Sequence, residues 1–207
     1  MTYRRLNLII YRPGRCGHFL QYLFGLSTHV YSLCGTLDRS QAYSFRCLHQ
    51  RYGSWQEHHA YHSRRFGTDR SQVVEFLTKS QHPLAVGSCH PHEFTDYVQP
   101  YVLSASQTQV HYYGVKCGLE LEQQLEDFMV NQYNPLKKNV VEQEFEMASN
   151  LVVCEFIQDY IDLDLIVNPE SFYAEYLRVA GLMCVPTVSE SVAREFYSDW
   201  RRERFGD

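Results

Sequence analysis

Apolar residues occur in this chain in two patterns, as short continuous runs and as longer stretches in which they recur at helical spacing. The runs, typical of strands buried on both faces, cover residues 6–11, 84–89, 109–116 and 161–167, with a less regular one at 28–34. Helical spacing covers residues 18–26, 69–80, 119–131, 140–160 and 189–204, and Asn168-Pro169-Glu170 indicates the start of a further helix through Leu182. This alternation predicts one three-layer α/β/α domain, residues 1–207, around a mostly parallel sheet.

Two parts of the chain stand apart from this pattern. Residues 35–65 are polar, aromatic and basic without a clear period, and we expect an irregular excursion there. Such excursions in compact domains serve as lids or binding loops, and one packed by its own aromatic residues is an equal alternative. Residues 140–207 are predicted to be mainly helical.

The first predicted strand and helix are joined by a very short turn, Arg12-Pro13-Gly14-Arg15-Cys16-Gly17. Gly14 and Gly17 can take positive φ and allow a ligand close to the main chain. A helix that begins directly after a turn directs its unpaired N–H groups and its positive dipole end into that turn. With two arginines beside it, the turn is predicted to bind an anion; the alternative is a tight connection without a ligand.

The turn and the helix after it resemble the 5′-phosphosulfate loop of the sulfotransferase family. The residues that carry the resemblance are Arg15-Cys16-Gly17-His18-Phe19-Leu20, with Cys16 at the usual Ser and His18 at a usual Thr or Asn. The loop is one residue short and lacks the hydroxyls that the family places on the phosphate. The resemblance implies a P-loop-type fold in which Arg12, Gly14, Arg15, Cys16, Gly17, His18 and Phe19 bind 3′-phosphoadenosine 5′-phosphosulfate.

Two further segments bear on this resemblance. His90-Pro91-His92 follows the strand at 84–89, as a Thr-His-Xaa-Pro segment does in the family, so His90 and His92 are candidate acid/base residues beside Arg15. In the family, an Arg at the end of the next strand and a Ser in the helix after it bind the 3′-phosphate. This chain has neither residue at those places. Lys116 is the candidate replacement, although an ammonium lacks the two-pronged geometry of a guanidinium.

Composition narrows the classes of function. The net charge of −5 argues against non-specific nucleic-acid binding, and no apolar run is long enough to span a membrane. The seven cysteines are dispersed without a CxxC pair, which predicts reduced thiols in a reducing compartment.

His58, His59 and His62 have metal-ligand spacing, but a surface histidine run is the better interpretation, and no metal is expected. The 16 tyrosines are typical of surfaces that meet other protein chains.

Two hypotheses follow. In the first, the chain is a sulfotransferase that passes a sulfuryl group from 3′-phosphoadenosine 5′-phosphosulfate to a hydroxyl acceptor. In the second, the degenerate loop marks a non-catalytic sulfotransferase-fold subunit of a large assembly of protein chains. A phage virion is such an assembly, and the C-terminal part of the chain, with Pro169-Glu170 before a helix pair that ends in Trp200, resembles small bacterial and phage sulfotransferase-like proteins. The first places the chain in the cytoplasm and the second in a virus particle, and neither calls for a membrane or for sequence-specific nucleic-acid binding.

Overall fold

The computed structural model describes residues 4–11, 16–27, 29–32, 83–89, 108–132 and 156–206. The predicted excursion at 35–65, the helix at 69–80 and most of the helix at 140–160 lie outside the described residues. None of the helices within the described ranges combines the length and apolar character that a membrane crossing requires.

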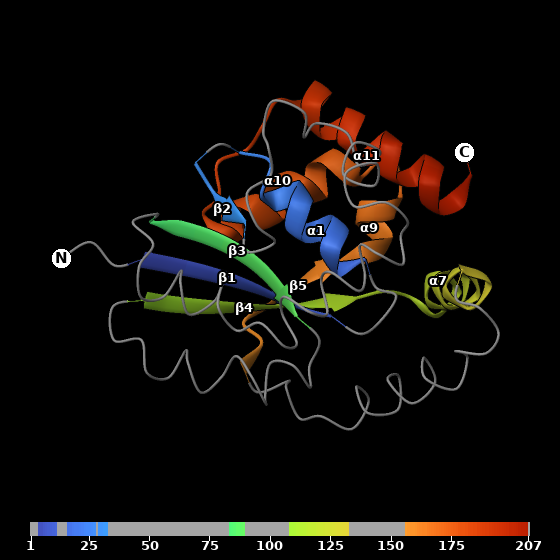
Figure 1. Cartoon of the computed structure of the whole chain (residues 1–207), viewed down its shortest axis with the longest axis horizontal. Helices are drawn as coiled ribbons and strands as arrows, with labels where there is room; N and C mark the ends of the chain where they lie inside the picture. The colour runs from blue at the N-terminus through green and yellow to red at the C-terminus, as the bar shows by residue number, and fades with distance from the viewer. Residues whose placement is uncertain are drawn as a thin grey trace.

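A five-stranded sheet with strands in the order β2-β3-β1-β4-β5 forms the centre of the fold (Figure 1). Its members are β1 (Arg4–Ile10), β2 (Tyr31–Ser32), β3 (Leu84–Cys89), β4 (Thr108–Lys116) and β5 (Asp159–Asp162). Each neighbouring pair is parallel. The predicted parallel α/β sheet is therefore confirmed, with β1 in the middle, where it is buried on both faces.

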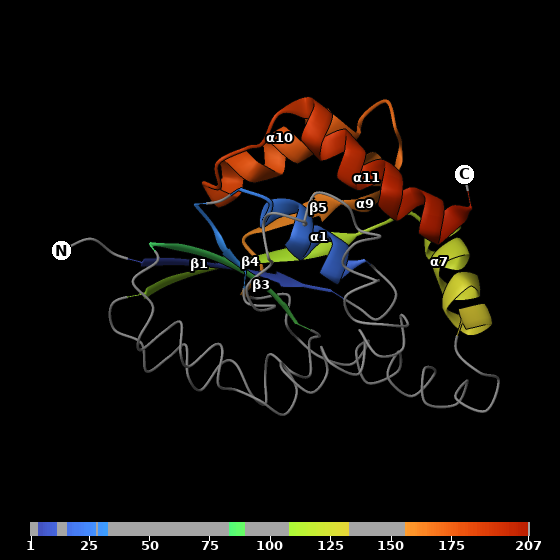
Figure 2. The ribbon, with the colours of Figure 1, turned by 45° about the horizontal axis from the view of Figure 1, so that its top comes forward.

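The described helices are α1 (Gly17–Phe24), α7 (Leu119–Gln132), α9 (Leu163–Val167), α10 (Phe172–Met183) and α11 (Glu190–Phe205). Of these, α1, α10 and α11 lie together on one face of the sheet (Figure 2). The second helical layer of the predicted three-layer domain is not tested by the described residues.

The end of the chain departs from the predicted elements in two places. The strand predicted over 161–167 is wrong in its second half, because residues Leu163–Val167 form α9. The helix predicted up to Tyr160 is wrong at its end, because β5 begins at Asp159. Leu163 and Ile166 are both fully buried, which is the spacing of a helical face, and the Asp162 carboxylate accepts the Leu165 N–H at 3.5 Å as an N-cap. Apolar alternation over so short a stretch fits either structure.

The helix predicted to begin at Asn168-Pro169-Glu170 begins later, at Phe172. The Asn168 side chain accepts the Glu170 N–H at 2.9 Å, a turn-forming bond that competes with helix formation. Pro169 is thus part of a turn rather than the first residue of α10.

Helix α1 is held between the sheet and α11. On the sheet side, the Ser88 hydroxyl donates to the Gln21 side chain at 2.5 Å, and both residues are buried. On the other side, the Phe19 ring stacks on Trp200 with centroids 4.0 Å apart and on Phe196 with centroids 5.6 Å apart. These contacts fix the start of α1 next to the carboxyl end of β1.

The first residue of α1 must be glycine because of Tyr11, the residue after β1. A Cβ built on Gly17 would lie 2.1 Å from Cδ1 and 2.3 Å from Cγ of the Tyr11 ring. The ring is 5% exposed, and Cγ is close to its own backbone, so the ring cannot move aside cheaply. Gly17 itself does not have positive φ, in contrast to the freedom considered from sequence; it makes room for an aromatic ring.

We predict that Gly17→Ala destabilises the protein by about 1–3 kcal/mol, the usual cost of overpacking a filled site. The matched control is Gly181→Ala in α10, where an added Cβ meets nothing within 4 Å. This control is expected to stabilise the protein by about 0.5–1 kcal/mol, since alanine favours a helix over glycine. Chemical denaturation measures both, and a Gly17→Ala protein as stable as the wild type would contradict the packing of Tyr11 on Gly17.

Candidate functional site

The candidate site lies at the carboxyl edge of the sheet, where β1 ends and α1 begins. Ile10 is in register with Cys89 of β3 on one side and with Gly114 of β4 on the other. The ends of three neighbouring parallel strands therefore meet at the start of α1. Open α/β sheets bind their ligands at this edge.

Of the residues predicted to form the site, the structure describes only some. Cys16, Gly17, Phe19 and Lys116 are described, and so is the backbone of His18 within α1. The remaining predicted residues lie outside the described residues: Arg12, Gly14, Arg15, His90 and His92. The roles assigned to these five remain predictions.

Cys16 has the most unusual backbone at the site. With φ 56° and ψ 24° it is left-handed, a conformation that costs a non-glycine residue about 1–2 kcal/mol. Its carbonyl accepts the Leu20 N–H at 3.0 Å, the first hydrogen bond of α1. A left-handed residue followed by right-handed ones turns successive N–H groups towards a common point, the arrangement of anion-binding nests. The left-handed residue is thus Cys16 rather than the glycine that follows it.

The Cys16 thiol is not arranged as a nucleophile. Burial raises the pKa of the Cys16 thiol, and the positive charge of Arg204 only partly opposes this effect. A thiol in this state is mostly protonated near neutral pH, and the side chain makes no capping hydrogen bond to α1. Its contribution to the site is therefore the shape of the backbone.

The side chains of Phe19 and Lys116 are both engaged in contacts within the protein. The Phe19 side chain is 2% exposed and belongs to the aromatic stack with α11, so its ring is in the core. Lys116, the last residue of β4, is exposed, and its ammonium forms an ion pair with Asp162 at 3.1 Å. A surface pair of this kind contributes about 0–1 kcal/mol, so a phosphate could displace Asp162 at little cost.

One residue near the site was not identified from the sequence as part of it. Arg204, in the last turn of α11, is 7% exposed and close enough to Cys16 to act on its thiol. In the sequence, Arg204 is the last residue of the helix predicted over 189–204. One feature of the sequence could have indicated that Arg204 faces the core: it follows Trp200 by four residues and Phe196 by eight, which places it on the apolar face of α11.

Within the described ranges, no three His, Cys, Asp or Glu side chains come together in a group that could hold a metal ion. The carboxylates beside Lys116 have other contacts: Asp162 caps α9, and Asp164 accepts the Gly118 N–H at 2.6 Å.

No family model and no curated protein matches this chain. Among solved structures, the chain is similar to a fungal RNA kinase, with a TM-score of 0.52 and 8% sequence identity over 96% of this chain and 97% of that chain. It is also similar to shikimate kinase from Bacteroides thetaiotaomicron, with a TM-score of 0.46 and 11% identity over 88% of this chain and 99% of that chain. The likeness to the RNA kinase shows the fold alone: the chain has a P-loop kinase-like α/β fold.

Proposed function

We propose that this protein transfers a sulfuryl group from 3′-phosphoadenosine 5′-phosphosulfate to a hydroxyl acceptor at the start of α1. The observation that carries the proposal is the left-handed Cys16 directly before α1, at the end of the central strand of a P-loop kinase-like fold. This geometry directs backbone N–H groups at the place where such folds bind a transferable anionic group. The resemblance of residues 15–20 to the sulfotransferase loop supports the choice of donor.

The residues of the turn favour sulfuryl over phosphoryl transfer. Kinases with a P-loop use a Lys on the β- and γ-phosphates and a Ser or Thr hydroxyl on Mg²⁺. The turn of this chain has neither, since Gly17 is followed by His18 and Phe19. Arg12 and Arg15 instead provide guanidinium donors, which match the oxygens of a sulfate or phosphate two at a time without a metal.

In the proposed reaction, the acceptor oxygen forms a bond to sulfur as the bond from sulfur to the bridging phosphate oxygen breaks. His90 or His92 takes the proton of the acceptor hydroxyl, and 3′-phosphoadenosine 5′-phosphate leaves. Arg15 and the N–H groups at the start of α1 stabilise the charge that develops on the bridging oxygen.

A second candidate function is a non-catalytic subunit of a multi-chain assembly. The ion pair of Lys116 with Asp162 favours it, because Lys116 is the candidate residue for binding the 3′-phosphate and its charge is already paired within the protein. The loss of the loop hydroxyls, with Cys16 at the usual Ser, points the same way. The association of this candidate with a phage particle rests on the sequence resemblance alone.

Calorimetry with 3′-phosphoadenosine 5′-phosphate on the purified chain tests the enzyme directly. We expect micromolar binding, weakened at least about tenfold by Arg15→Ala, because a hydrogen bond to a charged group contributes about 1.5–3 kcal/mol. Arg202→Ala is the control, since Arg202 is exposed and pairs with Asp199 at 3.1 Å. Absence of binding heat from the wild-type chain would refute the proposed donor.

The role of Lys116 can be separated from that of the turn by comparing two ligands. Lys116→Met is expected to weaken 3′-phosphoadenosine 5′-phosphate about fivefold, the size of one partly screened ionic contact of about 1 kcal/mol. Adenosine 5′-phosphate, which lacks the 3′-phosphate, should bind the variant and the wild type equally. Equal loss for both ligands would show that Lys116 does not bind the 3′-phosphate.

Native mass spectrometry of the purified chain distinguishes the second candidate. A structural subunit is expected to form oligomers, because it exists to contact other copies or partner chains. A monomer at micromolar concentration that also binds 3′-phosphoadenosine 5′-phosphate would count against the structural role.

A further inference from the structure

The ion pair of Lys116 with Asp162 joins the last residues of two neighbouring strands. Lys116 ends β4 and Asp162 ends β5, and the two are partners in the parallel register, with Lys116 Nζ 3.1 Å from Asp162 Oδ2. Two residues before Lys116, Gly114 of β4 is in register with Ile10, the last residue of β1. The pair is therefore at the carboxyl edge of the sheet, the edge at which the proposed donor site begins.

Asp162 is held in place by contacts that do not involve Lys116. Its N–H donates to Glu175 Oε1 at 3.1 Å, and Glu175 is buried and paired with Arg178 at 2.7 Å. Its carboxylate also caps α9 by accepting the Leu165 N–H at 3.5 Å. A carboxylate anchored in this way keeps its position and its helix cap when the lysine moves away.

Lys116 is the movable partner of the pair. Its side chain is 58% exposed and carries an ammonium on a flexible stem, whereas the Asp162 side chain is 25% exposed. An exposed pair of this kind favours the paired arrangement by at most about fivefold. A phosphate monoester carries a charge of about −1.5 to −2 near neutral pH, so it attracts the ammonium more strongly than one carboxylate does.

We propose that Asp162 is an internal competitor of the donor's 3′-phosphate: it holds the Lys116 ammonium in the free protein and releases it when the 3′-phosphate binds. This inference rests on the proposed function, in which Lys116 binds that phosphate, and extends it to the regulation of the site. The exchange makes binding weaker than an unpaired lysine would allow. Asp162 therefore sets how strongly the protein distinguishes a 3′-phosphorylated nucleotide from one without that phosphate.

A merely structural ion pair, which only joins the ends of β4 and β5, predicts a different result. Removing the Asp162 charge would then lower the melting temperature and leave the affinity for each nucleotide unchanged. The exchange predicts tighter binding of the nucleotide that carries the 3′-phosphate, because the ammonium no longer has to leave a partner. Asp162→Asn suits this comparison, since asparagine caps a helix as well as aspartate does and the substitution removes only the charge.

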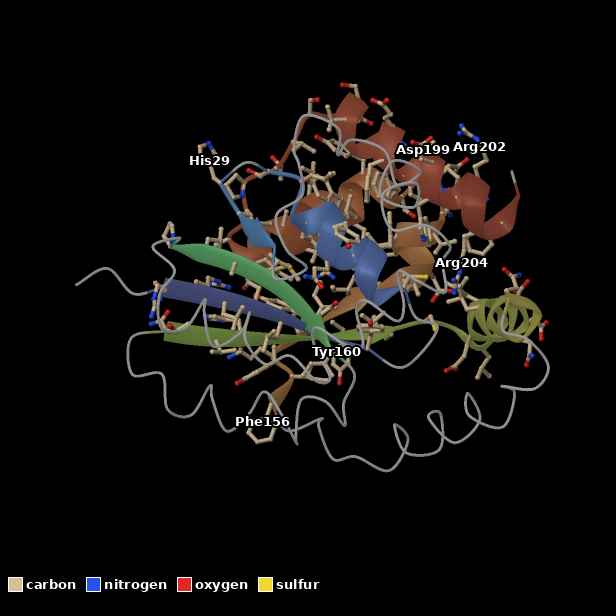
Figure 3. All side chains as sticks on the ribbon, viewed as in Figure 1. His29, Phe156, Tyr160, Asp199, Arg202 and Arg204 are labelled. Carbon is tan, nitrogen blue, oxygen red and sulfur yellow. The ribbon has the colours of Figure 1, made fainter. Side chains whose placement is uncertain are left out.

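The chain offers a matched control in a second ion pair of the same geometry. Arg202 Nη1 lies 3.1 Å from Asp199 Oδ1, and the two side chains are 60% and 16% exposed. Figure 3 shows this pair on the outer side of α11. Asp199→Asn removes the same charge and frees a cation of similar exposure, so it separates the effect of the position of the pair from the effect of net charge.

The experiment is calorimetry on the full chain with 3′-phosphoadenosine 5′-phosphate and with adenosine 5′-phosphate, and thermal melting shows that each variant is folded. We expect Asp162→Asn to bind 3′-phosphoadenosine 5′-phosphate about fivefold more tightly and adenosine 5′-phosphate as the wild type does. Asp199→Asn should bind both nucleotides as the wild type does. In a chain that already carries Lys116→Met, adding Asp162→Asn should change neither affinity, because the competition acts through Lys116.

A gain of less than about twofold for 3′-phosphoadenosine 5′-phosphate in folded Asp162→Asn would overturn the inference. An equal gain for both nucleotides, or a gain that persists without Lys116, would also overturn it, since Asp162 would then act by its charge alone. If Asp162→Asn does not fold, Asp162→Ser takes its place, because serine also caps a helix. Binding that Arg15→Ala weakens but that Asp162→Asn and Lys116→Met leave unchanged would refute the exchange and keep the proposed function. Absence of binding by the wild type and by Asp162→Asn alike would refute both.

Discussion

The packing of α1 between the sheet and α11 is the constraint on which the rest of the site depends. Gln21 accepts a hydrogen bond from Ser88 of β3, and Phe19 stacks on Trp200 of α11. Because one face of α1 meets the sheet and another meets the last helix, its first residue is fixed at the carboxyl edge of β1. The short turn between β1 and α1 must therefore connect the strand to a helix whose position is already determined.

That constraint explains two residues that otherwise look unfavourable. The left-handed backbone of Cys16 is strained for a residue with a side chain, and the packing on both sides of α1 compensates for the strain. Gly17 is required because the Tyr11 ring occupies the space where a Cβ would lie. The two residues therefore set the direction of the first N–H groups of α1 without a ligand present, which is the preorganisation that an anion site needs.

The sequence predicted the elements with strong, long patterns and missed the details that depend on tertiary contacts. The runs at 84–89 and 109–116 became β3 and β4, and the helices at 18–26, 119–131 and 189–204 were found to within two residues of their ends. The stretch 161–167 was wrong in part because burial of Leu163 and Ile166, rather than apolar alternation, decides its structure. Such burial depends on α10 and α11, which a local pattern does not contain.

The same distinction holds for the candidate site. The position of the turn between β1 and α1 could be predicted, because a strand, a glycine-containing turn and a helix are adjacent in the sequence. Arg204 could not, because its approach to Cys16 depends on how α11 packs on Phe19. The tyrosines show a related limit: Tyr113, Tyr176 and Tyr197 are buried with hydroxyls bonded to the backbone, although their number was attributed to surfaces. A residue count cannot separate an interface from a core in which each hydroxyl finds a partner.

The central claim is that the N–H groups at the start of α1 bind an anion. Nuclear magnetic resonance of the isotope-labelled chain tests it most directly, by titration with 3′-phosphoadenosine 5′-phosphate while the backbone amide signals are followed. The account predicts saturable downfield shifts of the Gly17 and His18 amide protons, as expected for N–H groups that gain a charged acceptor. Shifts confined to other parts of the chain, or none at millimolar ligand, would contradict it.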